Sequence, residues 1–289
     1  MQTSQRRVLL FLVLTALFAA VTFKFNMGAL ATMWGPGVAA LLTSIATSRK
    51  FSEFGWKPWP AKWLAAGWLI PVCAGTAAYS IIWATGLGAM PNPTFLQRGR
   101  VTIGMHGGPD WLFILAAFGF ITVINLLPNL VFALGEELGW RGLLVPELAR
   151  FTTFRRTAIL SGVFWGAWHL PMIMSGPYRG TGTPLWYQIT CFSIMVVATG
   201  VVAAWLRLRS GSIWPVAIFH AAHNGAIQIF FDPLTRDTGH THYFTGEFGC
   251  MLLPFYAAAA IYCLRNMASE SASSRSAQDF RPVLRDSRV

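Results

Sequence analysis

Long apolar runs, separated by short polar segments, recur along almost the whole chain. Several exceed the roughly 18 to 20 residues that a helix needs to cross about 30 Å of hydrocarbon, and none alternates with the two-residue period of barrel strands. The pattern therefore predicts an all-α fold, a polytopic membrane helical bundle of about eight transmembrane helices. The eight predicted spans are residues 8–23, 28–48, 63–86, 111–134, 157–175, 185–206, 212–231 and 244–264.

The two ends of the chain differ from this pattern. The first apolar run could belong to a cleaved secretory signal, but it is long and no clear small-x-small cleavage site follows, so we expect an uncleaved anchor. Residues 266–289 are rich in serine and in charged residues, and we predict a disordered cytoplasmic tail there. Residues 1–265 are expected to form a single transmembrane domain.

Composition supports a membrane protein, and the distribution of charge suggests its orientation. Apolar side chains make up 54% of the 289 residues and charged ones 11%, which is more apolar than a soluble domain needs. The net charge of +11 could suggest nucleic acid, yet the basic residues lie between the spans instead of clustering on one face. With a cytoplasmic N-terminus, 17 of the 22 Lys and Arg residues fall in cytoplasmic segments. We expect a multi-pass protein of the cell membrane, with both termini cytoplasmic, membrane lipid as a partner and no nucleic acid.

Few ionisable side chains lie within the predicted spans. Each costs about a few kcal/mol to insert into a membrane, so each is a candidate for function. The candidates are Glu136 and Glu137 at the end of the fourth predicted span, His169 in the fifth, and His220 and His223 in the seventh, with the polar Asn224 beside the last. A histidine buried alone is more often a packing residue, so His169 is a candidate functional residue only in combination with the others.

Helical spacing separates the roles of the two glutamates. Glu137 and Arg141 are four residues apart on one helix face, whereas adjacent residues point about 100° apart. Glu137 can therefore pair with Arg141 as structural support, which leaves Glu136 available as a candidate base. The alternative is that both glutamates only anchor a helix end at the lipid headgroups.

The histidines and the asparagine complete a set with recognisable chemistry. His220 and Asn224 are four residues apart, so they share one face of their helix, and His169 lies on another span. A carboxylate, two imidazoles and a carboxamide can activate water and stabilise an oxyanion. We therefore expect Glu136, His169, His220 and Asn224 to meet in a membrane-embedded active-site cavity that hydrolyses peptide or ester bonds.

These motifs resemble those of the intramembrane proteases that include the CAAX prenyl endopeptidases and the bacteriocin-processing and self-immunity proteins. The pattern of that family is E-E-x-x-x-R, then an aromatic-x-x-x-H, then H-x-x-x-N or H-x-x-x-D, and it is found here over about residues 130–225. The family usually has Phe four residues before the first histidine, where this chain has Trp165, a bulkier ring that would change the pocket shape.

The resemblance implies an intramembrane endopeptidase that cuts membrane-embedded or lipidated polypeptides. It implies that Glu136 and His169 activate water, that His220 and Asn224 stabilise the oxyanion, and that Glu137 and Arg141 support the site.

The sequence is also compatible with a metal-dependent mechanism and with two other functions. Glu136, His169 and His220 could ligate zinc with a water in the fourth position, but the chain lacks H-E-x-x-H and asparagine is an uncommon zinc ligand. We favour a mechanism without a metal or other cofactor. A non-catalytic immunity or scaffold protein is one alternative; a proton-coupled transporter is another, although we find no internal repeat of the kind transporters often have.

Overall fold

The computed structural model describes residues 3–58, 61–105 and 107–279, with only the backbone for 268–279. Within these residues the chain is helical and forms no β-strand, so the all-α prediction is confirmed. The α-helices are α1 (Thr3–Lys24), α2 (Gly28–Ala46), α3 (Ala61–Ala84), α4 (Pro93–Thr102), α5 (Asp110–Gly119), α6 (Leu126–Glu137), α7 (Val145–Ala149), α8 (Phe154–Ser175), α9 (Leu185–Ser210), α10 (Trp214–His223), α11 (Asp232–Leu234) and α12 (Leu253–Asp279).

The chain has several helices that can cross a membrane. Among the described residues, five helices are long and apolar enough, namely α1, α2, α3, α8 and α9. The segments Asp110–Ile124 and Leu126–Ala149, bent by 41° at their junction, give a sixth when they are taken together. The protein is therefore a multi-pass membrane protein, but the predicted count of eight is not confirmed. The seventh predicted span is divided, because α10 covers only 10 residues and is followed directly by a π-helix.

The beginning of the eighth predicted span is wrong. Residues 244–252 belong to the connection between α11 and α12, and the helix begins at Leu253. Gly246 has a φ of +67°, a left-handed conformation that glycine adopts without strain and that interrupts a helix. The backbone N–H of Gly246 donates to the Tyr79 hydroxyl at 2.9 Å, which fixes this turn against α3.

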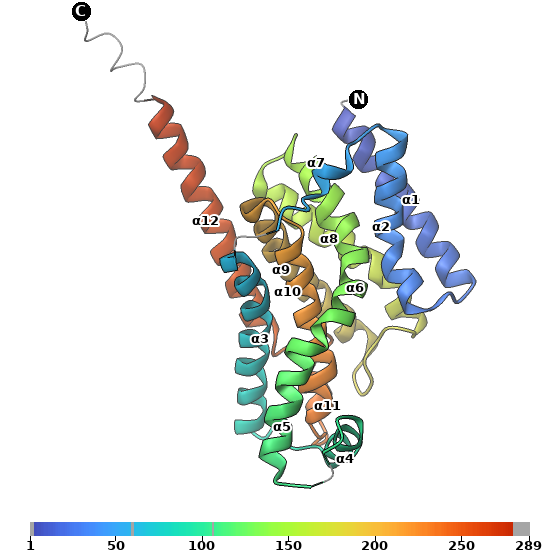
Figure 1. Ribbon diagram of the computed structural model, residues 1–289, viewed down its shortest axis with the longest axis vertical. Coiled ribbons are helices and arrows are strands. Elements are labelled where there is room, and N and C mark those ends of the chain that lie inside the picture. The colour runs from blue at the N-terminus through green and yellow to red at the C-terminus, as the bar shows by residue number, and fades with distance from the viewer. Residues whose placement is uncertain (1–2, 59–60, 106, 280–289) are drawn as a thin grey trace, which may run out of the picture.

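The helix at the C-terminal end is longer than predicted. α12 runs to Asp279, and in Figure 1 it extends away from the rest of the bundle. It thus covers residues 266–279, which we assigned to a disordered tail; residues 280–289 lie outside the described residues.

The helices around the centre of the chain form the body of the bundle (Figure 1). α1 and α2 form a hairpin at one side, and α2 packs against α6. α8 packs along α9, α3 packs along α10, and α12 packs on α9. α6, α8 and α10 are therefore held from outside by other helices, and these three carry the predicted site residues.

Two glycines allow α2 to lie directly against the segment that carries the glutamate pair. A Cβ atom added to Gly135 would lie 2.7 Å from the Trp34 ring, and one added to Gly139 would lie 2.6 Å from the Pro36 side chain. Small residues at such crossings let helix backbones approach closely within a membrane. Gly135 and Gly139 flank the glutamates, so this contact fixes the helix turn that bears Glu136.

Two segments of π-helix adjoin the predicted site. One covers Leu138–Leu144, directly after the glutamate pair, and the other covers Asn224–Phe231 and begins at a predicted site residue. π-Helical turns are rare and are often found at functional sites, because the wider turn redirects the side chains on either side of it. Helical structure continues through the first segment to the end of α7.

A buried ionic cluster ties the two N-terminal helices to α7. Glu147 Oε1 lies 3.2 Å from Arg7 Nη1 and 3.0 Å from Arg49 Nε, and the Glu147 side chain is fully buried. Burial lowers the pKa of Arg49 from its usual value, while the Glu147 carboxylate acts in the opposite direction. The cluster thus links three segments distant in the sequence at one end of the bundle.

Candidate active site

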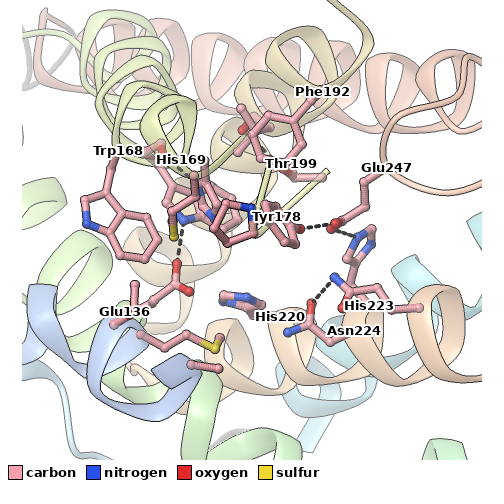
Figure 2. Close-up of a pocket in the computed structure, with 18 of the residues that line it drawn as sticks. Glu136, Trp168, His169, Tyr178, Phe192, Thr199, His220, His223, Asn224 and Glu247 are labelled. Carbon is pink, nitrogen blue, oxygen red and sulfur yellow. Dashed lines mark hydrogen bonds and ion pairs between the residues drawn. The ribbon is translucent and has the colours of Figure 1, made fainter. Parts of the chain in front are cut away.

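A cavity of about 610 Å³ lies between the α1–α2 turn and the helices α6, α8, α9 and α10. The side chains for which we predicted chemistry all line it, and Figure 2 shows them around a shared space. They are Glu136, His169, His220 and Asn224. Much of the remaining wall is apolar and aromatic, which is typical of a ligand site with a few placed polar groups.

Glu136 lies in the last turn of α6 and is 2% exposed. Its Oε2 atom accepts a hydrogen bond of 2.7 Å from the indole Nε1–H of Trp165 on α8. A carboxylate offers about four acceptor positions, so this single donor orients the group and leaves capacity for a water molecule.

His169 has its ring orientation set by its own helix. Its Nδ1 atom lies 2.9 Å from the backbone carbonyl oxygen of Trp165. A carbonyl only accepts, so Nδ1 carries the hydrogen and Nε2 of the neutral ring is left as a proton acceptor. The rings of Trp168 and Phe192, with centroids at 4.7 Å and 5.1 Å, enclose the imidazole.

Glu137 is fully buried and joins two partners. Its Oε1 atom lies 2.9 Å from Nη1 of Arg141, the pairing that the spacing predicted. The same oxygen lies 2.9 Å from Nδ1 of His220, a contact that the sequence did not predict. Because an ionised carboxylate only accepts hydrogen bonds, His220 donates through Nδ1 and directs its other nitrogen elsewhere. Glu137 therefore orients one of the candidate catalytic imidazoles.

Trp165 contacts four residues of the site, which are Glu136, His169, Arg141 and His220. Besides its bonds to Glu136 and His169, its ring lies 4.2 Å below the guanidinium of Arg141 and 5.4 Å from the ring of His220. The residue that departs from the family pattern is thus at the centre of the site, and the indole N–H that phenylalanine lacks is hydrogen-bonded to the candidate base.

Asn224 follows directly after α10, one turn beyond His220. Its Oδ1 atom accepts a hydrogen bond of 3.4 Å from Nε2 of Gln228. With the carbonyl oxygen engaged in this way, the Nδ2 hydrogens of Asn224 are the part of the amide that can donate to a ligand.

A second polar cluster lines the same cavity, and sequence reasoning missed most of it. Glu247, from the connection between α11 and α12, has Oε1 at 2.9 Å from Nε2 of His223 and accepts a hydrogen bond from the Tyr178 hydroxyl through Oε2. His223 Nδ1 in turn lies 2.6 Å from the Tyr256 hydroxyl. His223 is among the candidates from the sequence, but it lies off the helix face that His220 and Asn224 share. Glu247 could have been noticed as an acid inside a predicted span.

The three residues that could ligate zinc do not form a metal site as they are arranged. In the part of the chain that the structure describes, no group of three His, Cys, Asp or Glu side chains could hold a metal ion. One oxygen of Glu136 accepts from Trp165, and Nδ1 of both His169 and His220 bonds to a protein oxygen. Because no such group is found among the described side chains, we derive no step through a metal.

The comparisons with known proteins agree with the resemblance seen in the motifs. Residues 117–226 match a family model described as type II CAAX prenyl endopeptidase Rce1-like. The chain is also similar to a protein named CAAX prenyl protease 2 from Methanococcus maripaludis, with 36% identity over 124 residues. That alignment covers 41% of this chain and 44% of the relative, so the chain matches less than half of that protein's length.

The predicted resemblance is confirmed over the central part of the chain. Glu136, His169, His220 and Asn224 all lie within the matched residues, whereas Glu247 lies beyond them.

Proposed function

We propose that this protein is an intramembrane endopeptidase that hydrolyses peptide bonds of membrane-embedded or lipidated polypeptides. One observation carries the proposal: Glu136, His169, His220 and Asn224, from three separate helical segments, line a single cavity, and the first three of them are buried. The match of residues 117–226 to a peptidase family supports the same reaction class.

In the proposed mechanism, Glu136 and His169 activate water. A water in the cavity can donate one hydrogen bond to the carboxylate of Glu136 and one to Nε2 of His169, the ring nitrogen left without a hydrogen. As the water oxygen attacks the scissile carbonyl carbon, its proton passes to this acceptor pair. The proton is then delivered to the amine nitrogen when the C–N bond breaks.

In the same mechanism, His220 and Asn224 bind the negative oxygen that develops on the carbonyl. Asn224 can donate through Nδ2, and His220 can donate through Nε2 once its ring is an imidazolium. The carboxylate of Glu137, 2.9 Å from Nδ1 of His220, stabilises that imidazolium by direct charge pairing. Glu137 is therefore a positioning residue in this scheme, and Arg141 holds it in place.

The cellular test compares membrane peptides in cells that produce the wild-type protein or Glu136→Gln. We expect a set of membrane or lipidated polypeptides whose cleavage products disappear in the variant. Identical peptide profiles would indicate a scaffold or immunity protein without turnover. Solute flux into proteoliposomes that survives Glu136→Ala would indicate a transporter.

We also propose that the protein lies in the cell membrane with both termini in the cytoplasm, because of the distribution of its basic residues.

Exhaustive chelation should leave peptide hydrolysis unchanged, because the mechanism above assigns water activation to Glu136 and His169 alone. The measurement is the rate of cleavage by the purified protein before and after dialysis against a strong chelator, together with its zinc content. Stoichiometric zinc in the active protein, with activity lost on its removal and restored on its return, would contradict the scheme.

Replacing Trp165 with Phe should lower kcat/KM by about 10- to 100-fold. The change removes the Nε1–H donor to Glu136, and a hydrogen bond to a buried charged group contributes about 1.5–3 kcal/mol. The measurement is steady-state hydrolysis of a peptide substrate in detergent or liposomes.

Trp168→Phe is the matched control for this change. Trp168 also lines the cavity and packs on His169, but its indole makes none of the described hydrogen bonds to Glu136. Equal losses in the two variants would show that ring volume, and not the hydrogen bond to Glu136, accounts for the effect.

A further inference from the structure

Glu247 brings a second carboxylate to the wall of the catalytic cavity. In Figure 2 it lies on the side opposite Glu136, with His220 and Asn224 between them on the α10 side. It is 8% exposed, although it comes from a connection between helices and not from a helix. Burying a carboxylate in this way costs free energy unless the group has hydrogen-bonding or charged partners or a ligand.

The protein fixes the position of Glu247 from two sides. His223 contacts Oε1 and the Tyr178 hydroxyl donates to Oε2, and these residues come from α10 and from the connection between α8 and α9. Each carboxylate oxygen has two lone pairs, so one donor on each oxygen leaves both able to accept a further hydrogen bond. Donors to both oxygens also favour the ionised form of the group. Glu247 is thus held as an oriented anion at the cavity surface.

The rest of the cavity wall provides no fixed positive charge. None of the cavity-lining residues that the structure describes is Lys or Arg, whereas two of them are glutamates. The guanidinium of Arg141 lies behind Trp165 and is already paired with Glu137. Among the described lining residues, the histidines are the groups that can become positively charged, and His223 directs its Nε2 at Glu247 itself. In a poorly solvated cavity, this arrangement attracts cations and repels anions.

The second carboxylate is also linked to the proposed reacting centre through His223. Glu247 contacts His223, which directly precedes the candidate oxyanion donor Asn224. A peptide whose carbonyl binds at Asn224 would therefore bring a neighbouring side chain near Glu247, since successive residues of an extended peptide are about 3.3–3.6 Å apart. Lysine and arginine have the length and the charge to reach it.

We propose that Glu247 receives a basic side chain of the substrate, and that the protein cleaves internal peptide bonds flanked by Lys or Arg. This inference rests on the proposed peptidase function and adds the class of substrate. A C-terminal C-a-a-X motif would bring a free carboxylate within three residues of the modified cysteine, about 10 Å along the chain. The cavity has two carboxylates to oppose that group and no Lys or Arg to receive it.

The test uses quenched fluorescent peptides in liposomes that contain the full-length protein. One host peptide that the wild type cleaves is prepared with Lys, or with its neutral isostere norleucine, at each of three positions on either side of the scissile bond. At one position or more, we expect kcat/KM to be at least about 10-fold higher for Lys. This ratio should fall to within about twofold in Glu247→Gln, and it should persist in Asp237→Asn, which removes an exposed acid from the same connection. The ratio is independent of the active fraction, so partial misfolding of a variant does not affect it.

A second comparison uses only the wild type, so it stands even if Glu247→Gln does not fold. The host peptide is shortened to end three residues after the scissile bond, with either a free acid or an amide at its end. We expect the amide to be cleaved at least as fast as the acid. A clear preference for the acid, or a Lys-to-norleucine ratio unchanged in Glu247→Gln, overturns the inference. Absence of any cleavage beyond that of Glu136→Gln overturns the proposed function instead.

Discussion

Replacing Glu136 with Gln should lower kcat/KM for peptide hydrolysis by about 10³-fold or more while the fold remains intact. Glutamine has nearly the same shape and its carbonyl oxygen can still accept the indole N–H of Trp165. It cannot take a proton from water, and loss of a general base costs about 10²–10⁴-fold in rate. The measurement combines steady-state kinetics with thermal unfolding in the same detergent, and we expect the unfolding temperature to change little.

Two further variants decide whether Glu136 and His169 act as a unit. If both serve the same water, Glu136→Gln combined with His169→Ala should be no slower than the worse single variant, because groups that act together are not additive. Multiplied losses in the double variant would mean that the two residues act in separate steps. Activity in Glu136→Gln close to that of wild type would remove the basis of the proposed mechanism.

Replacing Arg141 with Met should lower the free energy of unfolding by about 3–5 kcal/mol. Glu137 and Arg141 are both fully buried, so the change leaves a carboxylate in the interior, with His220 as its one remaining partner among the described residues. Breaking a buried ion pair by removing one partner has about this cost, whereas replacing both partners is often far better tolerated. The measurement is equilibrium unfolding in detergent micelles.

A double-mutant cycle gives the control for this prediction. Glu137→Gln combined with Arg141→Met should recover much of the stability lost in Arg141→Met alone, with a coupling energy of about 1–3 kcal/mol. Activity should not recover, because Glu137→Gln removes the charge that orients His220 and stabilises its imidazolium. If activity returns together with stability, Glu137 has only a structural role.

The local part of the site could be predicted because it depends on spacing along one helix. Glu137 and Arg141 lie four residues apart, and the structure shows them paired at 2.9 Å. His220 and Asn224 share a helix face in the same way and line one cavity. Such pairs follow from helix geometry, since side chains three or four residues apart are neighbours whatever surrounds the helix.

The positions of His169 and His220 along their helices could not be related to each other from spacing in the sequence. His169 lies about 22 Å along α8 from its first residue, whereas His220 lies about 9 Å along α10 from its first residue. The two side chains line one cavity although they lie at different distances along their helices. The packing of α8 on α9, and of α10 on α3, determines how far each helix is displaced.

The second polar cluster was missed for a related reason. The run of apolar residues from 244 onwards predicts a helix. In a helix, nothing in the local pattern would direct the Glu247 side chain into the cavity. Its role became visible only in the turn that includes Gly246, where the side chain bonds to His223 and Tyr178 from two other segments. No periodicity in the sequence specifies such contacts.

The sequence by itself determined that the protein is all-α and crosses the membrane several times, because long apolar runs and helix periodicity act locally. It also determined which polar residues could carry chemistry, because few ionisable side chains lie among so many apolar ones. Only the tertiary structure decided that Trp165 bonds to Glu136, that Glu137 orients His220, and that Glu247 enters the cavity. These contacts join residues 24 to 83 positions apart, so they depend on how whole helices pack and not on any local pattern.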